Sequence, residues 1–363
     1  MTWQEQLQNS LRTIEELSQV IPLTSEEQVR MKKVLDSSPM LVTPYYLSLI
    51  DFSDENDPIR KIALPSFAET DLSGSYDTSG ESDNTVITGI QHKYAETALM
   101  LSTSSCAMYC RHCFRKRLVG IHDNDSVQDL DAVQTYLLAH PEINNVLVSG
   151  GDALLNSNKR LSQILDVLSE IEHLDFIRIA TRVPVTLPQR ITEDDDLLDI
   201  LNMINKKKQL FMVTQFDHPR EITPESAAAV KTVLGLGIPV RNQTVLLKGI
   251  NDDPDVLGAL LSTLVSIGAE PYYVFQCRPV SGVKSSFQVP LQKGVEIIEV
   301  ARGMQSGVSK AFRYCLSHVT GKIEILGKLE NDEMLFKYHE AKDRNDLGSV
   351  FVQKVSKDQA WLD

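Results

Sequence analysis

The sequence predicts an α/β protein built around a partial, TIM-like (β/α)6 barrel, with helices before the barrel and an antiparallel cap after it. Two observations lead to this fold class. From about residue 93, short apolar runs alternate with amphipathic helical stretches, as in a parallel sheet with crossover helices. After residue 310, strand-like runs follow one another without helices between them. We therefore expect four regions, at residues 1–69, 70–85, 86–310 and 311–363.

Residues 1–69 are expected to be helical. An apolar stripe with helical spacing is formed by Leu7, Leu11, Ile14 and Leu17. The residues Ser-Glu-Glu-Gln at 25–28 resemble a capping box that opens a second helix. Thr-Pro at 43–44 ends that helix, and a short helical stretch follows at 45–51. Residues 70–85 are polar, acidic and rich in Gly and Ser, so we expect a mobile surface loop or linker there.

The barrel is expected between residues 86 and 310. One of its helices shows at 161–171, where apolar residues recur on one face. Functional residues of such barrels lie at the carboxyl ends of the strands, so residues just after a strand are candidates for a site. The six expected barrel strands are 98–101, 145–148, 176–180, 210–214, 243–247 and 272–275. The cap, 311–363, is expected to contain strands near 312–316, 322–326, 334–338 and 349–355.

Composition and charge exclude several classes of protein. A chain of 363 residues can bury a substantial core, and 42% hydrophobic and 23% charged residues are ordinary for a globular protein. The net charge of −13 argues against non-specific nucleic-acid binding. No apolar run reaches the roughly 20 residues of a membrane span, and the start lacks an export signal. Five cysteines, three of them clustered, fit a reducing compartment, so we expect a cytoplasmic protein without membrane or nucleic-acid partners.

Three cysteines follow the first expected strand with the spacing Cys106-x3-Cys110-x2-Cys113. A structural zinc ion takes four protein ligands, and an electron-transfer [4Fe-4S] cluster is usually held by four cysteines. Three ligands leave one iron of a cluster open to a small molecule. A zinc site and three unrelated buried thiols are the alternative interpretations. The spacing, with an aromatic ring just before the last cysteine, resembles the signature of the radical S-adenosylmethionine (SAM) enzymes.

Two other segments carry groups suited to charged ligands. Residues 150–152 (Gly-Gly-Asp) follow the second expected strand, where backbone carbonyls can accept from an ammonium group and the carboxylate can balance its charge. Alternatively, these glycines only make a turn. A basic cluster beside the cysteines suits anionic cofactors or substrates, unless it is a solvated loop. It consists of Arg111, Arg115, Lys116 and Arg117.

Several separate motifs together resemble the lysine 2,3-aminomutase family. They include the cysteine segment 106–117 and the segment that starts Ser149-Gly-Gly-Asp, and they extend over roughly residues 25–330. The other matching segments are 43–46, 56–60, 187–191, 242–247 and 293–299. The resemblance implies a radical SAM barrel, amino-acid 2,3-aminomutase activity and three cofactors, namely a [4Fe-4S] cluster, SAM and pyridoxal 5'-phosphate (PLP).

By this resemblance, the cluster is held by Cys106, Cys110 and Cys113. His112 would pack against the SAM adenine, in a pocket completed by Gln243 and by Gln215, which stands where the family has a histidine. The SAM amino group would meet the segment made of Ser149, Gly150, Gly151 and Asp152.

The resemblance also indicates how PLP is bound. Lys322, in a Gly-Lys pair, corresponds to the PLP-binding lysine, which must be a primary amine of lowered pKa. Alternatively, Lys322 is an exposed lysine in a turn. Lys93 and Tyr94 match a pair that anchors PLP, whereas a second phosphate-binding arginine is replaced by Thr97. Arg115 matches the arginine that binds the substrate α-carboxylate, a task suited to a planar fork of donors.

The chain departs from the lysine enzymes in the expected substrate pocket. Two aspartates that bind the distal ammonium of lysine are replaced by Arg278 and Cys315. Two like charges about 4 Å apart repel by about 4 kcal/mol at an effective dielectric constant of roughly 20. Lysine is then a poor substrate, and an amino acid with an acidic or hydrogen-bonding side chain, glutamate above all, suits Arg278 better. Alternatively, Arg278 turns outward or pairs with a neighbouring acid. A structural zinc site of some members is also absent, with Asp253 in place of its first cysteine.

We therefore expect a radical SAM, PLP-dependent 2,3-aminomutase that acts on a small-molecule amino acid other than lysine. An electron donor such as flavodoxin or ferredoxin and a homo-oligomeric state are expected with it. Three alternatives stay open. They are lysine 2,3-aminomutase activity on free or protein-bound lysine, a radical SAM enzyme that is not a mutase, and a non-enzymatic iron–sulfur or zinc protein.

Overall fold

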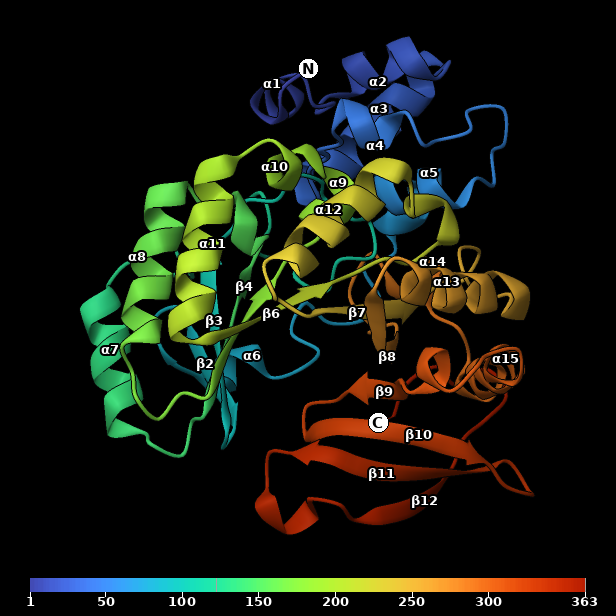
Figure 1. Cartoon of the computed structure of the whole chain (residues 1–363). Coiled ribbons are helices and arrows are strands. Elements are labelled where there is room, and N and C mark those ends of the chain that lie inside the picture. Colours follow the sequence, from blue (N-terminus) through green and yellow to red (C-terminus); the bar gives the residue numbers. More distant parts are fainter. Residues whose placement is uncertain (122, 363) are drawn as a thin grey trace.

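The centre of the protein is a parallel barrel sheet. The computed structural model describes residues 1–121 and 123–362, and its 12 strands form one sheet in chain order. The six barrel strands run parallel to one another and confirm the predicted α/β fold (Figure 1). They are β3 (Thr97–Thr103), β4 (Asn145–Gly150), β5 (Phe176–Ala180), β6 (Gln209–Thr214), β7 (Val240–Leu246) and β8 (Ala269–Gln276).

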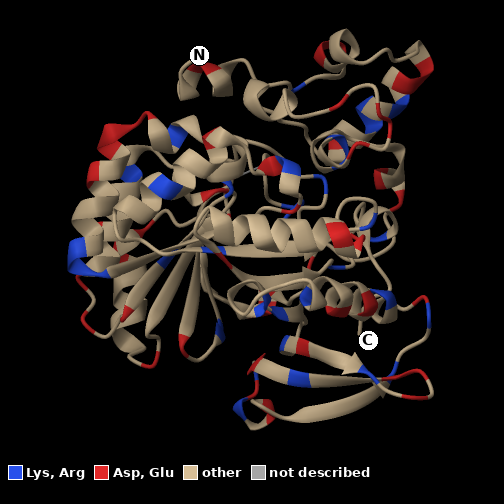
Figure 2. Ribbon diagram, turned by 45° about the vertical axis from the view of Figure 1, so that its right-hand side comes forward, with Lys and Arg blue, Asp and Glu red and all other residues tan. Residues whose placement is uncertain are grey.

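Helices cover the outer side of these strands. In α8, the predicted apolar face at 161–171 is buried against the sheet, and the central strands bury residues such as Val146 and Val148. The charged residues in Figure 2 lie mainly on helices and connecting segments, which leaves the barrel strands largely uncharged. The covering helices are α7 (Leu130–Ala139), α8 (Asn158–Ser169), α11 (Asp195–Lys207), α12 (Pro224–Gly235), α13 (Pro254–Ser266) and α15 (Leu291–Gly303).

The sheet continues past both edges of the barrel. β2 (Ile90–Tyr94) pairs antiparallel with β3, and β1 (Thr85–Ile87) pairs with β2. The predicted C-terminal strands exist, but the first of them, β9 (Arg313–Ser317), is parallel to β8 and extends the barrel sheet. The reason is the intervening α15, since a helical crossover brings the chain back in the same direction. Only β10 (Gly321–Lys328), β11 (Glu333–Ala341) and β12 (Val350–Lys354) add to β9 in antiparallel order.

The N-terminal region is helical, as predicted, but its first helix is divided. The expected stripe is interrupted because Leu11 leaves the helical path and forms a β-bridge with Val42. The second predicted helix begins one residue earlier than expected, with Thr24 as its cap and Glu27 completing the capping box. The elements are α1 (Trp3–Gln8), α2 (Ile14–Val20), α3 (Ser25–Ser37), α4 (Pro44–Leu47) and α5 (Pro58–Ala63), which lie together at the top of Figure 1.

Residues 70–85 match the expected surface loop only in part. They contain α6 (Glu81–Asn84), and the side chains of Ser79, Glu81 and Asn84 are buried. The segment is also tied to the chain after β8, since the amide of Ser75 donates to the carbonyl of Pro279 at 3.0 Å. Residues 70–76 are nonetheless exposed, so the polar composition reflects solvation there and contacts inside the protein only near residues 79–84. The region boundaries themselves remain predictions.

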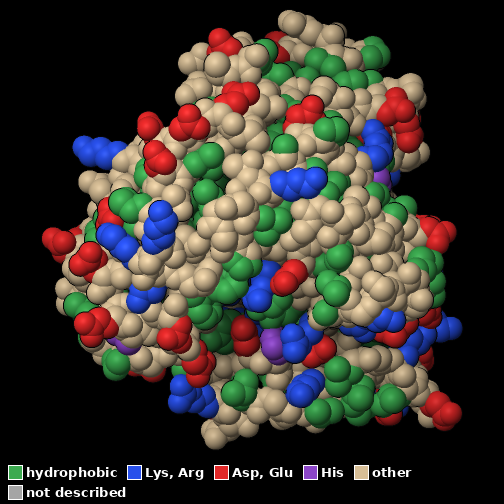
Figure 3. All heavy atoms as spheres, in the orientation of Figure 1, with side chains coloured by type: hydrophobic (Ala, Val, Ile, Leu, Met, Phe, Trp, Pro, Cys, Tyr) green, Lys and Arg blue, Asp and Glu red, His purple; other side chains and the backbone are tan. Residues whose placement is uncertain are grey.

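Charged side chains are distributed over the visible surface, and the helices are short (Figure 3). On the face seen in Figure 3, acidic and basic side chains are interspersed, so that face lacks the continuous basic surface that binds nucleic acid. Within residues 1–121 and 123–362, every helix is too short or too polar to cross a lipid bilayer.

We predict that Tyr314→Phe lowers the thermal unfolding midpoint. Tyr314 on β9 is buried and its hydroxyl donates to Gln276 Oε1 on β8 at 2.5 Å, which joins the C-terminal strands to the barrel. Removal of the hydroxyl leaves a buried acceptor unpaired, at a cost of about 1–3 kcal/mol. Tyr76→Phe, at an exposed position, is the control and is expected to change stability by less than about 0.5 kcal/mol. Equal midpoints for the two variants would contradict the prediction.

Candidate active site

Most of the candidate residues line one cavity at the carboxyl ends of the barrel strands. Its volume is about 360 Å³, and its wall is made by the barrel, the cysteine segment, α6 and β10. The position is the one that the strand-end rule predicts for a parallel barrel.

Cys106, Cys110 and Cys113 lie in the segment that follows β3, and all three line the cavity as free cysteines. Burial raises the pKa of each thiol, to about 12 for Cys110, and neighbouring thiols add to the effect at Cys106 and Cys110. Three partly buried sulfur donors that line one cavity are suited to a thiolate-bound metal centre, which withdraws their protons on binding.

The N-terminal helices hold the cysteine segment in place. The amide of Tyr109 donates to the carbonyl of Leu41, and the amide of Arg111 donates to the carbonyl of Ile62. The buried side chains of Arg111 and Lys116 both pair with Glu69. These two members of the basic cluster therefore have structural partners and are not available to an anionic ligand.

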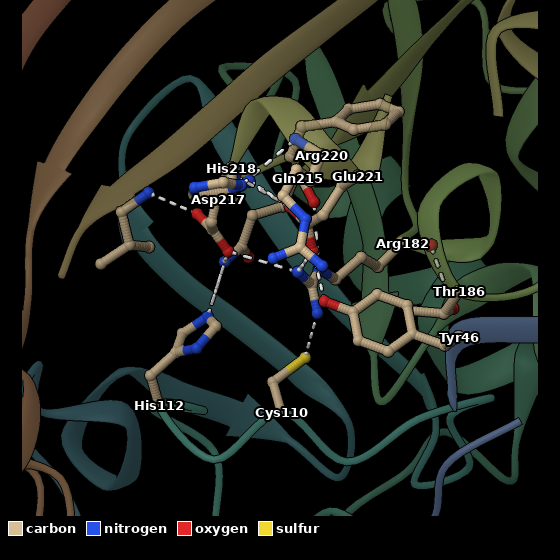
Figure 4. Close-up of polar contacts among 12 residues, drawn as sticks. Tyr46, Cys110, His112, Arg182, Thr186, Gln215, Asp217, His218, Arg220 and Glu221 are labelled. Carbon is tan, nitrogen blue, oxygen red and sulfur yellow. Dashed lines mark hydrogen bonds and ion pairs between the residues drawn. The ribbon is translucent and has the colours of Figure 1, made fainter. Parts of the chain in front are cut away.

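Arg182 is the principal site residue that our sequence reasoning missed. It follows β5, and its guanidinium donates from Nη1 to Cys110 Sγ at 2.8 Å (Figure 4). Its Nη2 pairs with Glu221 at 2.5 Å and with Asp217 at 3.4 Å. The hydroxyl of Tyr46 donates to the same Glu221 at 2.6 Å. The signal for Arg182 was its place directly after a barrel strand.

His112 and Gln215, which the resemblance assigns to the SAM pocket, lie side by side. His112 Nε2 is 2.9 Å from Gln215 Nε2 and 3.3 Å from Asp217 Oδ2. Its other ring nitrogen, Nδ1, is buried without a partner among the described residues. Burial opposes ionisation of Asp217, but contacts with His112 and Arg182 hold its pKa below the ordinary value. Gln243 on β7 also lines the cavity.

The Gly-Gly-Asp segment differs in part from our expectation. Gly150 has φ 118°, a conformation that favours glycine, and its carbonyl accepts from Arg115 Nη1 at 3.3 Å. The carboxylate of Asp152 accepts from the hydroxyl of Thr181 and the amide of Arg182, both at 2.6 Å. Because protein donors already occupy this carboxylate, its first role is to join the ends of β4 and β5.

Lys322 and Lys93 enter the cavity from the two strands that flank the barrel sheet. The side chain of Lys322 is only 13% exposed, which excludes an exposed turn lysine, and its Nζ donates to Glu340 at 2.8 Å. Lys93 Nζ donates to the carbonyl of Ser79 at 3.3 Å. Burial and the positive charges of Arg278, Lys342 and Lys322 lower the pKa of Lys93 to about 8. Tyr94 lies beside both lysines in the cavity wall.

Arg278 and Arg115 lie against one aromatic ring. Their guanidinium carbons are 4.1 Å and 4.6 Å from the ring centre of Phe114. Arg115 pairs with Glu81 at 3.2 Å. Arg278 instead donates to the hydroxyls of Ser79 at 2.9 Å and Ser317 at 3.0 Å. Among the described residues, no carboxylate lies within ion-pair distance of Arg278, and it lines the cavity rather than turning outward.

Cys315 is not a substrate residue in this structure. It is completely buried in β9 and is absent from the cavity wall, to which Ser317, two residues further along the strand, contributes instead. Residues two apart share a face of a strand, so the difference lies in their position along β9, whose last residue, Ser317, is the one that reaches the cavity wall. Thr97 does line the cavity, with its hydroxyl accepting from Asn145 at 3.0 Å.

Comparison with known proteins assigns the family. No protein-family model matches the chain. A lysine 2,3-aminomutase homologue from Aquifex aeolicus is 41% identical over 356 residues, which cover 97% of this chain and 94% of its own. The L-lysine 2,3-aminomutase of Acetoanaerobium sticklandii is 42% identical over 84% of this chain and 73% of its own. The chain belongs to the lysine 2,3-aminomutase family.

Membership makes this protein an amino-acid 2,3-aminomutase, and therefore an isomerase, as the motifs predicted. The family also contains the glutamate 2,3-aminomutase of Clostridioides difficile, which is 39% identical over 84% of this chain and 71% of its own. Relatives with different named substrates are thus about equally similar to this aminomutase. Overall identity does not select the substrate, so the selection depends on the residues of the cavity wall.

We predict that Gly150→Ala destabilises this aminomutase. A Cβ at Gly150 would lie 2.2 Å from the carbonyl oxygen of Thr103, and the positive φ disfavours any L side chain. The expected loss is about 1–3 kcal/mol or more, measured as a lower thermal unfolding midpoint. Gly235→Ala is the matched control, since a Cβ there meets nothing within 4 Å and lies in α12. It should raise the midpoint slightly, and a similar response of both variants would refute the prediction.

Proposed function

We propose that this chain is a SAM- and PLP-dependent 2,3-aminomutase that moves the amino group of an acidic amino acid, glutamate above all, from Cα to Cβ. The observation that carries the proposal is Arg278, whose guanidinium lines the cavity and is held by two serine hydroxyls without a carboxylate partner among the described residues. A buried cation in this state favours an anionic ligand. It also opposes the ammonium of lysine by charge repulsion.

The pairing of Arg278 with Arg115 supports a substrate that has two carboxylates. The guanidinium groups of Arg278 and Arg115 both contact the ring of Phe114. They are therefore close enough for one small substrate to contact both. Arg115 would orient the α-carboxylate and Arg278 the distal carboxylate, each as a planar fork of donors. This arrangement leaves Cα and Cβ between the two anchors, where the reaction takes place.

The residues present fit the cofactors that the family implies. The three cysteines are free and line the same cavity, and the Nδ1 of His112, which has no partner in the described part of the chain, is an unused polar group in the pocket assigned to SAM. Gln215, Gln243 and the segment 149–152 would complete that pocket. When bound, the cluster with SAM supplies a hydrogen-abstracting radical, and PLP supplies the group that carries the migrating nitrogen. The chain itself binds and orients these groups and keeps water out of a largely buried cavity.

Lys322, Lys93 and Tyr94 would bind PLP, and Arg178 is the additional phosphate donor that the replacement at Thr97 requires. Arg178 lies on β5 in the cavity wall, and its Nε is buried without a partner among the described residues. Its Nη2 donates at 2.6 Å to Asn145, whose amide group in turn donates to Thr97. Arg178 thus contacts Thr97 through Asn145. Its Nε, which has no partner among the described residues, is suited to bind a phosphate oxygen near Thr97.

An external electron donor such as flavodoxin or ferredoxin, a homo-oligomeric state and a cytoplasmic location remain predictions from the sequence.

The substrate proposal is tested by anaerobic reconstitution with iron, sulfide and PLP, followed by reduction and addition of SAM with glutamate, aspartate, alanine, arginine or lysine. We expect a β-amino acid from the acidic substrates. Arg278→Met should raise the KM for glutamate about 30-fold or more, since loss of a buried charge partner costs at least about 2 kcal/mol. Arg302→Met, on the outer helix α15, is the control and should leave KM unchanged.

Two results would overturn separate parts of this proposal. β-Lysine as the main product would remove the acidic substrate and leave the aminomutase chemistry in place. An absorption band of bound PLP that persists in Lys322→Ala would remove Lys322 from its assigned role.

We also predict that PLP binds more weakly as the pH rises through about 8. Lys93 has its pKa lowered to about 8, so it is protonated below that pH and loses its charge above it. If the charged form holds the phosphate, the dissociation constant of PLP should rise by up to about tenfold per pH unit above 8. In Lys93→Arg the rise should disappear. Pyridoxal, which lacks the phosphate, is the control ligand, and an identical pH profile for both ligands would contradict the prediction.

A further inference from the structure

We propose that Arg182 raises the reduction potential of the iron–sulfur cluster, and that the buried carboxylates of Glu221 and Asp217 limit this effect. The inference rests on the cluster assignment in the proposed function and is independent of the substrate. It gives a role to a buried charge network that neither the cysteine motif nor the substrate pocket accounts for.

The first observation is the direction of one guanidinium nitrogen. Arg182 Nη1 donates to Cys110 Sγ at 2.8 Å, while its Nε donates to the carbonyl of Gln215 at 3.0 Å and its Nη2 faces two carboxylates (Figure 4). An arginine that served only to neutralise those carboxylates would have no need of the sulfur. Hydrogen bonds and positive charge at a cluster sulfur favour the reduced state, which carries one more negative charge.

The second observation is the balance of charge around Arg182. The side chains of Glu221 and Asp217 are both completely buried, at 0% exposure, and that of Arg182 is 10% exposed. Water screens these charges poorly, so each acts on the others over a longer range than at the surface. The two carboxylates oppose the positive charge that Cys110 receives from Arg182. The reduction potential of the cluster should therefore depend on Arg182, Glu221 and Asp217 together. Removal of the arginine and removal of a carboxylate should shift this potential in opposite directions.

The third observation is that the network is rigid. Glu221 accepts from the hydroxyl of Tyr46 and from the backbone amides of Asp217 and His218. Asp217 accepts from the amide of Val245 at 2.9 Å. These contacts from α4 and the ends of β6 and β7 hold the two carboxylates in place, and the carboxylates hold the guanidinium against the sulfur. This is the geometry of a positioning residue that acts on the cluster through its ligand.

The test compares midpoint potentials of reconstituted protein in EPR-monitored redox titrations without SAM. Arg182→Gln should move the potential to a more negative value, because a positive charge is lost. Glu221→Gln keeps the size of the side chain and one of its two acceptor oxygens but removes an opposing charge, so it should move the potential to a more positive value. Arg190→Gln is the control for loss of a buried arginine, since Arg190 is 1% exposed, pairs with Asp194 and makes no contact with the cysteines. Its potential should equal that of the wild type.

Opposite shifts in Arg182→Gln and Glu221→Gln at wild-type iron and sulfide content would establish the proposal. Shifts of the same sign, or an unchanged potential in Glu221→Gln, would overturn it. If Arg182→Gln does not retain its cluster, the direction of the shift in the isosteric Glu221→Gln decides the matter alone. A wild-type protein that takes up no cluster would overturn this inference together with the cofactor assignment, whereas a lysine-specific enzyme would leave it untouched.

Discussion

Parallel pairing of the six barrel strands is the constraint on which the site depends. Because β3 to β8 run in one direction, their carboxyl ends meet at one edge, and segments more than 100 residues apart deliver side chains to the same cavity. The cysteine segment follows β3, Asp152 follows β4, Arg182 follows β5 and Gln215 follows β6. The extension of the sheet by β9 and β10 then brings Lys322 to the same opening.

Buried charge organises this cavity in two separate sets. One set surrounds Cys110 and consists of a single arginine opposed by two carboxylates. The other contains Lys93, Arg115, Arg178, Arg278 and Lys322, which exceed the neighbouring acids Glu81 and Glu340 in number. An excess of buried positive charge is costly unless anions enter, so the second set suits a phosphate and the carboxylates of a substrate. In the first set the arginine is already paired with acids of the protein and needs no further anion. It is therefore suited to act on a bound metal centre at all times.

Sequence patterns predicted much of the fold because barrel strands and helices have strong periodicity. The divided first helix and the buried side chains at 79–84 were missed because each depends on a contact from a distant residue. Leu11 leaves the helix to pair with Val42, and Glu81 is buried by Arg115, so neither outcome is visible in local composition. Cys315 was misplaced for a similar reason, since alignment of a strand residue does not reveal which side chain reaches the cavity.

The sequence alone determined the metal-binding motif and the family, because the spacing of Cys106, Cys110 and Cys113 and the order of the motifs are local properties of the chain. The resemblance also predicts that a positive charge replaces an acid at Arg278. The tertiary structure decided how these residues are used, namely that Asp152 is already occupied by protein donors and that Arg278 has only hydroxyl partners. It alone placed Arg182 against Cys110, because a hydrogen bond between residues 72 positions apart is set by packing and leaves no pattern in the sequence.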